Sequence, residues 1–471
     1  MNQITEMNKM GTMPIKKLML SMGIPMIISM VLQAVYNIVD SAFVSNMSGV
    51  GEAALNALTL AFPMQMLMVA IAIGTGVGTN ALLAKSLGQG DIEKVNKVSG
   101  NGIFLAAVIY SAFLFFGMFG VKAYIASQTT NALVSEMAID YLRICCVASF
   151  GIVFFSIFEK LLQSTGRSMF STISQITGAV TNIILDPVMI YGYLGFPALG
   201  VKGAAYATVI GQIVSLALAL IFHLKINKEI SNHPKYFKPS IRIIKEIYAI
   251  GLPAIIAQAL MSVMTYGLNI ILGMIGESMV TAYGLYYKVQ QFVLFAAFGL
   301  RDSITPIVSF NHGLCNQNRI KEGIKYGMIY TLAIMAAGLI ILEIFAAPIS
   351  QIFGLSGETQ SLCVSAMRIV SVCFLFAGAN IAFQGIFQAL DSGMESLIIS
   401  LCRQLIFILP VAWIFARSAV NNPNYTWLVW VTFPIAEIVT AAIACLLMIR
   451  TYKNKIESIH ENVFETAADI S

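Results

Sequence analysis

Four polar residues share one face of the first apolar stretch of the chain. They are spaced i, i+3, i+4 and i+7, so a helix of about 3.6 residues per turn places them on the same side. The four are Gln33, Tyr36, Asn37 and Asp40. A carboxylate in an apolar helix is unfavourable unless it faces a bundle interior or a wet cavity, so Asp40 is a candidate functional residue. Such a group can hold a proton or help to bind a small cation.

The composition indicates the class of protein. Of 471 residues, 58% are hydrophobic and 11% are charged, whereas soluble domains carry about 25% charged residues. The apolar runs have the length of helices, and only helices or closed barrels can span lipid. We therefore predict an all-α polytopic membrane protein that lies in the lipid bilayer. The net charge of +5 reflects membrane topology and gives no support to nucleic-acid binding.

Motifs for several other activities are absent from the sequence. The chain contains no G-x-x-x-x-G-K-[ST], H-E-x-x-H or G-x-S-x-G, so we predict neither ATP-driven transport nor an enzyme. The seven cysteines form no C-x-x-C pair and mostly lie in apolar runs. We therefore expect no disulfide framework, no metal site and no cofactor.

Twelve apolar stretches of about 20 residues are expected to be transmembrane helices. The first six lie near 18 to 44, 55 to 83, 101 to 125, 136 to 161, 169 to 192 and 203 to 225. The second six lie near 246 to 274, 281 to 310, 324 to 347, 362 to 388, 396 to 417 and 426 to 450.

The distribution of basic residues predicts the orientation in the membrane. If the N-terminus is cytoplasmic, that side receives most of the lysines and arginines, Lys160 and Arg403 among them. Both termini are then cytoplasmic, and we expect the protein in the plasma membrane. The predicted parts are two six-helix halves at 1–225 and 246–450, a basic cytoplasmic linker at 226–245 and a cytoplasmic tail at 451–471.

The two halves repeat one another in sequence. Residues 22–25 (Met-Gly-Ile-Pro) recur as 250–253 (Ile-Gly-Leu-Pro), Gly74 recurs as Gly299, and Gly88 as Gly313. An offset that stays near the same value over six helices indicates an internal repeat. Because six is an even number, the repeats are parallel and related by an axis along the membrane normal. Transporters built this way place substrate between the halves and rock one half against the other.

Depth along the helices brings further polar residues to the level of Asp40. Tyr141 lies near the outer start of the descending fourth helix, while Asn182 and Asp186 lie one turn apart on the rising fifth helix. We predict an ion-coupling cluster, with a structural hydrogen-bond network as the alternative. Its members are Asp40, Asn37, Tyr141, Asn182 and Asp186. Because a proline follows Asp186, a helix end would also explain that residue.

A second set of polar residues is assigned to the substrate cavity. The seventh helix repeats the polar stripe of the first without an acid, since the position paired with Asp40 is near Leu268. The predicted cavity residues are Gln33, Tyr36, Glu159, Gln175, Gln258, Ser262, Thr265, Tyr266, Asn269 and Gln384. Packing between helices is the alternative. For Glu159, a boundary ion pair with Lys160 would be sufficient.

Three more charged residues and two prolines lie at membrane level. Adjacent residues do not face each other on a helix, so Arg301 and Asp302 are each expected to need another partner, as is Glu437. Pro25 and Pro253 occupy matching places in the first helix of each half. A proline removes a backbone donor and kinks a helix, so we predict that both are hinges.

The whole pattern resembles the multidrug and toxic compound extrusion (MATE) family over about residues 12 to 450. The resemblance rests on the twelve helices, the two parallel halves and the polar stripe that follows Gly23-Ile24-Pro25. It implies that the family's coupling acid corresponds to Asp40, with Tyr141, Asn182 and Asp186 beside it. It also implies cation-driven antiport of lipophilic, often cationic drugs out of the cytoplasm.

We therefore expect a monomeric secondary active exporter of small lipophilic cations, coupled to H+ or Na+. A lipid or lipid-linked oligosaccharide flippase is the alternative. Such a cavity would carry several basic residues, whereas mainly Lys288 and Arg301 lie at membrane level here. An intramembrane enzyme would need a D-x-x-x-D motif or a His-Asp pair at one membrane face, which the sequence lacks.

Overall fold

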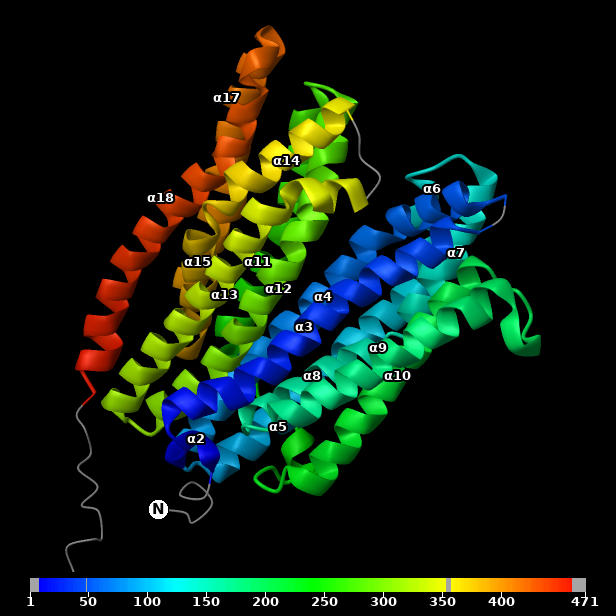
Figure 1. The fold of residues 1–471 in the computed structure, drawn as a ribbon. Helices are drawn as coiled ribbons and strands as arrows, with labels where there is room; N and C mark the ends of the chain where they lie inside the picture. Colours follow the sequence, from blue (N-terminus) through cyan, green and yellow to red (C-terminus); the bar gives the residue numbers. More distant parts are fainter. Residues whose placement is uncertain (1–7, 48, 353–356, 460–471) are drawn as a thin grey trace, which may run out of the picture.

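The computed structural model describes residues 8–47, 49–352 and 357–459, and all regular structure in these ranges is helical (Figure 1). The N-terminal half consists of α2 (Lys9–Thr12), α3 (Ile15–Ser45), α4 (Gly51–Gly88), α5 (Ile92–Phe115), η1 (Phe116–Gly120), α6 (Val121–Ala126), α7 (Ala132–Val147), α8 (Phe150–Ser164), α9 (Ser168–Tyr191), η2 (Tyr193–Gly195) and α10 (Val201–Ile226). The linker holds η3 (Pro234–Phe237). The C-terminal half consists of α11 (Ile241–Gly273), α12 (Glu277–Gly313), α13 (Gln317–Ile352), α14 (Gly357–Ser371), α15 (Phe374–Ala389), α16 (Gly393–Leu401), η4 (Cys402–Ile406), α17 (Ile408–Asn421), η5 (Pro423–Tyr425), α18 (Thr426–Tyr452) and η6 (Lys453–Glu457). These elements confirm the all-α prediction.

The helices account for the predicted membrane spans. Within the described ranges, ten helices are long and apolar enough to cross a membrane, and two bent pairs bring the total to twelve if each pair is one span. The pairs are α7 with α8, bent by 43°, and α14 with α15, bent by 56°. The prediction that residues 136–161 and 362–388 each form a single helix was therefore wrong, because each range contains a bend between two helices. At the second bend, the side chains of Ser371 and Cys373 bond carbonyls three residues back and compete with the helix backbone.

The two prolines that were predicted to be hinges do not lie at these bends. Pro25 is inside α3 and Pro253 is inside α11, and each of these helices is continuous. The bends of more than 40° instead occur at corresponding places of the two halves, in the fourth span of each. The function of the two prolines as hinges stays a prediction.

The internal repeat is visible in how the halves pack. A Cβ on Gly88 would collide with the carbonyl oxygen of Phe310, and a Cβ on Gly313 would collide with the carbonyl oxygen of Lys85. These two contacts are equivalent, because Gly88 corresponds to Gly313 and Lys85 to Phe310 at the same offset. The repeated glycines therefore lie where α4 and α12 approach each other across the boundary between the halves, in agreement with a two-repeat architecture.

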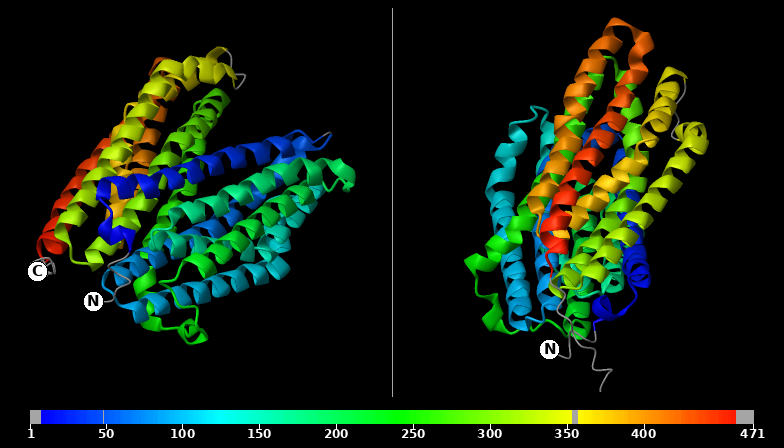
Figure 2. Two further views of the ribbon diagram at one scale, coloured as in Figure 1. Left: turned by 60° about the horizontal axis from the view of Figure 1, so that its bottom comes forward. Right: turned by 90° about the vertical axis from the view of Figure 1, so that its left-hand side faces the viewer.

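The halves meet near the end of the molecule that carries both termini and diverge toward the opposite end (Figures 1 and 2). Gly251 in the first part of α11 packs against Gly74 of α4. The same face of α11 continues through Gln258, Ser262 and Asn269, because these residues follow at i+7, i+11 and i+18. Ser262 and Asn269 are exposed. This face therefore passes from a helix contact into an open space between the halves, which we call the cleft.

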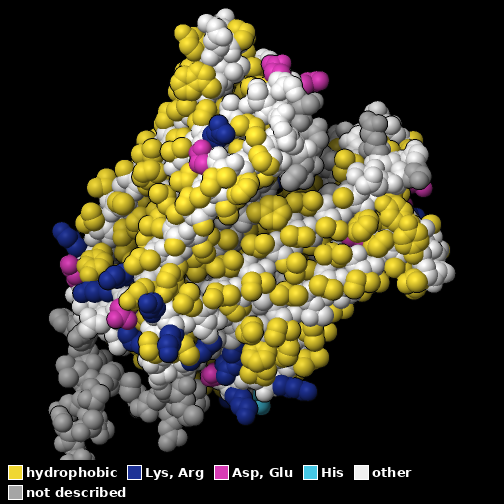
Figure 3. All heavy atoms as spheres, in the orientation of Figure 1, with side chains coloured by type: hydrophobic (Ala, Val, Ile, Leu, Met, Phe, Trp, Pro, Cys, Tyr) yellow, Lys and Arg dark blue, Asp and Glu magenta, His cyan; other side chains and the backbone are white. Residues whose placement is uncertain are grey.

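The outer surface and the ends differ in chemistry. Large apolar side chains such as Ile24, Phe115 and Leu446 are exposed, and Figure 3 shows hydrophobic side chains over most of the visible face. Basic side chains gather at the end that carries the termini (Figure 3), where Lys16 and Lys17 are exposed. An apolar belt with a basic end is the surface expected of a protein that spans a bilayer.

The linker is attached to the N-terminal half. Asn101 of α5 accepts a 2.8 Å hydrogen bond from the Ser240 backbone N–H, and Asn96 accepts one of 2.7 Å from the Ser231 N–H. The first helix of the second half, α11, begins at Ile241, five residues before the predicted boundary. The connection between the halves is therefore a short segment anchored on α5.

Candidate functional site

Two carboxylates are buried inside the N-terminal half. The side chain of Asp186 on α9 has no exposed surface, and Asp40 on α3 is 8% exposed. Asn182 donates through its Nδ2 to Asp186 Oδ1 at 3.3 Å and to Thr208 Oγ1 of α10 at 3.4 Å. Among the described residues, Asp40 Oδ1 and Asp186 Oδ2 have no hydrogen-bond partner. These acids therefore lie buried among polar groups, and no basic side chain pairs with them within the described residues.

The aromatic members of the cluster lie beside these acids. Tyr141 is buried on α7, and its hydroxyl receives a 3.4 Å hydrogen bond from Gln65 Nε2 of α4. The charge of Asp40 is near enough to act on Tyr141, Tyr36 and Asp186. The structure thus brings together the predicted Asp40, Tyr141, Asn182 and Asp186. The side chain of Asn37 lies outside the part of the chain that the structure describes.

Two cluster contacts were not foreseen from the sequence. Gln65 and Thr208 lie in long apolar helices, and single polar residues of this kind give no signal of which neighbour they will meet. The explanation of Asp186 as a helix end is wrong. Helix α9 continues past Pro187 to Tyr191, and Gly192 in the left-handed conformation follows it.

A chain of polar side chains connects α3 and α9 below the acids. Gln175 Nε2 donates to Gln33 Oε1 at 2.9 Å, and the hydroxyl of Ser29 donates to Gln175 Oε1. Ser29, Gln33 and Asp40 follow one face of α3, so this face is turned toward α9 inside the N-terminal half. Gln33 and Gln175 thus contact each other, and their assignment to a substrate cavity stays a prediction.

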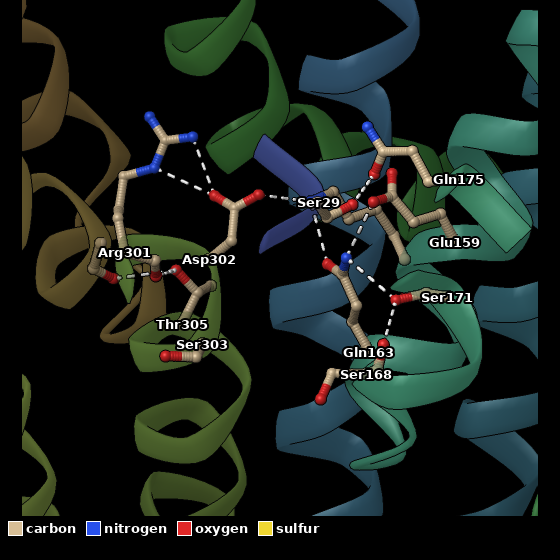
Figure 4. A network of polar contacts seen from close by, with 12 residues as sticks. Ser29, Glu159, Gln163, Ser168, Ser171, Gln175, Arg301, Asp302, Ser303 and Thr305 are labelled. Atoms are coloured by element: carbon tan, nitrogen blue, oxygen red, sulfur yellow. Dashed lines mark hydrogen bonds and ion pairs between the residues drawn. The ribbon is translucent and has the colours of Figure 1, made fainter. Parts of the chain in front are cut away.

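An ionic network joins the two halves (Figure 4). Lys160 of α8 is 2% exposed, and its Nζ lies 2.7 Å from Asp302 Oδ2 of α12. Arg301 Nη2 lies 2.8 Å from the other oxygen of Asp302. Asp302 is therefore held between a lysine of one half and an arginine of the other.

This network corrects three predictions. Lys160 is not at the cytoplasmic end. It is buried between helices, where its ammonium group forms an ion pair with Asp302. Arg301 and Asp302 do face each other, since the long arginine side chain folds back onto its neighbour. Glu159 does not depend on a boundary ion pair: it accepts a 3.0 Å hydrogen bond from Gln163 Nε2, while Lys160 donates to Gln163 Oε1 at 2.9 Å.

The C-terminal half contains a second buried pair. Arg403, in η4, donates through Nε to Glu437 Oε1 at 2.6 Å, and Asn380 of α15 donates to Glu437 Oε2 at 2.8 Å. Arg403 was expected on the cytoplasmic side, which is wrong, because it is buried and its charge is matched by Glu437. Asp302 and Glu437 thus have basic partners, whereas Asp40 and Asp186 form no ion pair within the part of the chain that the structure describes.

The polar residues predicted for the cavity of the C-terminal half separate into two groups. Tyr266 is 70% exposed, and Ser262 and Asn269 are also exposed, whereas Thr265 is partly buried and donates to Met261 O. Gln258 and Gln384 instead lie in the wall of one small cavity near the inner end of the cleft.

This cavity has a volume of about 30 Å³. Its polar wall consists of Gln258, Arg301, Gln384, Gln388, Ser400 and Gln404. The space is sufficient for about two water-sized groups and is far smaller than a drug. A transported molecule could therefore place only one polar group in it.

Comparison with known proteins assigns the family. A protein-family model described as MatE matches residues 25–188 and 253–414, one match in each half. The chain belongs to the MatE family. MATE proteins are transporters, so the resemblance found in the sequence is confirmed.

Relatives and solved structures agree with this assignment. The MATE chain is 25% identical to the multidrug export protein MepA of Staphylococcus haemolyticus (strain JCSC1435), over 92% of this chain and 93% of that protein. It is 26% identical to MepA of Staphylococcus aureus (strain NCTC 8325 / PS 47), over 92% and 94% of the two chains.

The fold is likewise similar to that of solved MATE proteins. An outward-facing multidrug resistance MATE transporter of the MOP superfamily superposes with a TM-score of 0.86 at 25% identity, over 96% of this chain and 98% of that one. A MATE protein in the straight conformation gives a TM-score of 0.87 at 25% identity, over 96% and 99% of the two chains.

Proposed function

We propose that this MATE protein exports lipophilic, often cationic drugs from the cytoplasm in exchange for H+ or Na+. The observation that carries the proposal is the pair Asp40 and Asp186, which are buried without a basic partner among the described residues. A carboxylate in such a place is costly unless a cation neutralises it. The names of the MepA relatives, which are multidrug export proteins, support drugs as the cargo.

Coupling follows from a difference between conformations. In the outward-open arrangement, Asp40 and Asp186 accept a cation from outside, with Asn182 and Tyr141 available to orient the ion or the proton. In the inward-open arrangement the ion is released. An ion can drive this exchange only if it binds one conformation more tightly than the other. The substrate then moves in the opposite direction through the space between the halves.

The contrast between the halves supports an N-terminal coupling site. Asp302 has Lys160 and Arg301 as partners, and Glu437 has Arg403. Their charges are matched within the protein, so these acids need no ion from outside. We place the basic end of the molecule and both termini in the cytoplasm and the protein in the plasma membrane, because basic residues favour the cytoplasmic side.

The test is efflux of a fluorescent cation from proteoliposomes under an imposed pH gradient or sodium gradient, one at a time. Asp40→Asn should abolish gradient-driven efflux and leave the amount of folded protein unchanged. The matched control is Asp140→Asn, which changes a partly exposed acid on α7 that pairs with Lys202 at 3.0 Å. Undiminished efflux from Asp40→Asn would refute the coupling role.

A further inference from the structure

We propose that the small cavity near the inner end of the cleft binds a carboxylate group of a transported molecule. This inference rests on the proposed export function and specifies a substrate class for the C-terminal half. The cavity lies at the boundary of the halves, because Ile73 and Val77 of α4 form one wall and residues of α11 and α12 form another. It is therefore a place that a molecule in the cleft can reach.

Arg301 supplies the charge. Its Nε and Nη2 donate to Asp302 Oδ1 at 3.1 and 2.8 Å, while Nη1 has no partner among the described residues. Figure 4 shows the guanidinium group with one nitrogen directed away from Asp302. The ring of Phe298, also in the cavity wall, lies 4.9 Å from the guanidinium carbon and holds it in place. A planar guanidinium group with a free N–H binds carboxylates well.

Gln404 supplies a second donor in the cavity wall. Its side chain is 7% exposed. Its Oε1 is enclosed by the protein, whereas Nε2 is not among the enclosed unpartnered atoms and forms no hydrogen bond within the described residues. The N–H₂ group is therefore the part of this side chain that can meet a carboxylate.

Two other amide side chains of the cavity wall already donate hydrogen bonds within the protein. Gln384 Nε2 donates to Ser400 Oγ at 2.9 Å, and Gln388 Nε2 donates to Ser396 Oγ at 3.3 Å. These bonds fix the wall between α15 and α16. Arg301 and Gln404, with Gln258 beside them, are then the groups left to meet a guest.

Size and charge select the guest. A volume of about 30 Å³ accepts about two water-sized groups, which equals the two oxygens of one carboxylate. An ammonium group would be repelled by Arg301. The rest of a substrate would remain in the cleft, beside the exposed face of α11.

The test compares binding of two dyes that differ in one group. A rhodamine with a free benzoate and its methyl ester, which is a cation, are titrated against the full-length protein in nanodiscs by fluorescence polarisation. Gln404→Met should weaken binding of the benzoate dye about ten-fold, the effect of losing one hydrogen bond to a charged group. It should change binding of the ester less than about two-fold.

Two further variants control this result. Arg301→Lys keeps a positive charge beside Asp302 but removes the free guanidinium nitrogen, and should also weaken only the benzoate dye. Gln128→Met makes the same replacement as Gln404→Met at an exposed position outside the cavity and should change neither dye. The proposal would be overturned if Gln404→Met weakened binding of both dyes equally or changed binding of neither. It would also be overturned if phosphatidylglycerol displaced the benzoate dye and free benzoate did not. Binding needs no gradient, so failure of ion-driven export of the ester would count against the proposed function alone.

Discussion

Lys160 Nζ of the N-terminal half lies 2.7 Å from Asp302 Oδ2 of the C-terminal half, and both side chains are almost completely buried. Removing one member of a buried ion pair leaves a charge without compensation, which typically lowers stability by about 3–5 kcal/mol. Asp302 also contacts Arg301, so the two members of the pair are not equivalent. This asymmetry allows an ordered prediction.

Asp302→Asn should destabilise the protein more than Lys160→Met. The first change leaves two cations, Lys160 and Arg301, without their acid, whereas the second leaves Asp302 with Arg301. The expected order of melting temperature in detergent is wild type, then Lys160→Met, then Asp302→Asn. Lys160→Arg keeps the charge and serves as the control. A melting temperature of Asp302→Asn equal to that of the wild type would contradict the burial argument.

Asp40→Asn and Asp186→Asn should behave in the opposite way. Each of these acids has a carboxylate oxygen without a partner in the described part of the chain. An amide of the same shape removes the cost of burying a charge, so both variants should melt at or above the temperature of the wild type at pH 8. Glu437→Gln, which leaves Arg403 unmatched, should melt lower. A lower melting temperature for Asp40→Asn would indicate a structural role for its charge.

Gly313→Ala should be destabilising, because its Cβ would collide with the carbonyl oxygen of Lys85 across the boundary of the halves. Backbone cannot move away as a flexible side chain can, so we expect a loss of about 1–3 kcal/mol. The control is Gly284→Ala in the same helix, where a Cβ would meet no atom within 4 Å. That change should be neutral or slightly stabilising, since alanine favours helix. The measurement is thermal unfolding of the two variants under the same conditions, and equal melting temperatures would contradict the prediction.

Lys85 and Asp391 form another ion pair across the boundary. Both side chains are partly exposed, so the pair contributes about 0–1 kcal/mol and its loss should scarcely change the melting temperature. Lys85→Asp, however, places two acids together at the inner end and should favour separation of the halves there. The double variant Lys85→Asp/Asp391→Lys should restore the wild-type state. Spin-label distances across the inner end, measured for single and double variants, provide the readout, and a double variant that stays open would contradict the pairing.

Much of the architecture could be predicted from the sequence, because it depends on local composition and periodicity. Helix-length apolar runs gave the spans, and the repeated glycines such as Gly88 and Gly313 gave the relation between the halves. The bends near Ser149 and Ser371 could not be predicted, since both lie within continuous apolar runs.

The site was predictable only in part. Asp40 and Asp186 are acids and Asn182 is an amide, and all three lie in apolar helices. Their residue types alone therefore identified them as candidate site residues. Lys160 and Arg403 were misplaced because a basic residue near a helix end normally lies at the membrane boundary. Their partners, Asp302 and Glu437, are 142 and 34 residues away in sequence. A contact at such separation depends on tertiary packing, which no local pattern contains.

In the described ion pairs between the halves, the base always comes from one half and the acid from the other. Within the described residues, the N-terminal half contributes the lysines Lys85, Lys94 and Lys160, and the C-terminal half contributes the acids Asp391, Glu246 and Asp302. The glycine contacts are equivalent in the two repeats, so by shape alone two N-terminal halves could pack together. Charge disfavours it, because the N-terminal half has Ser21, Val77 and Gly166 at the positions equivalent to Glu246, Asp302 and Asp391, so its three lysines would have no acid to pair with. Produced as two separate polypeptides divided within the linker, the halves would therefore be expected to select each other and to reject their own copies.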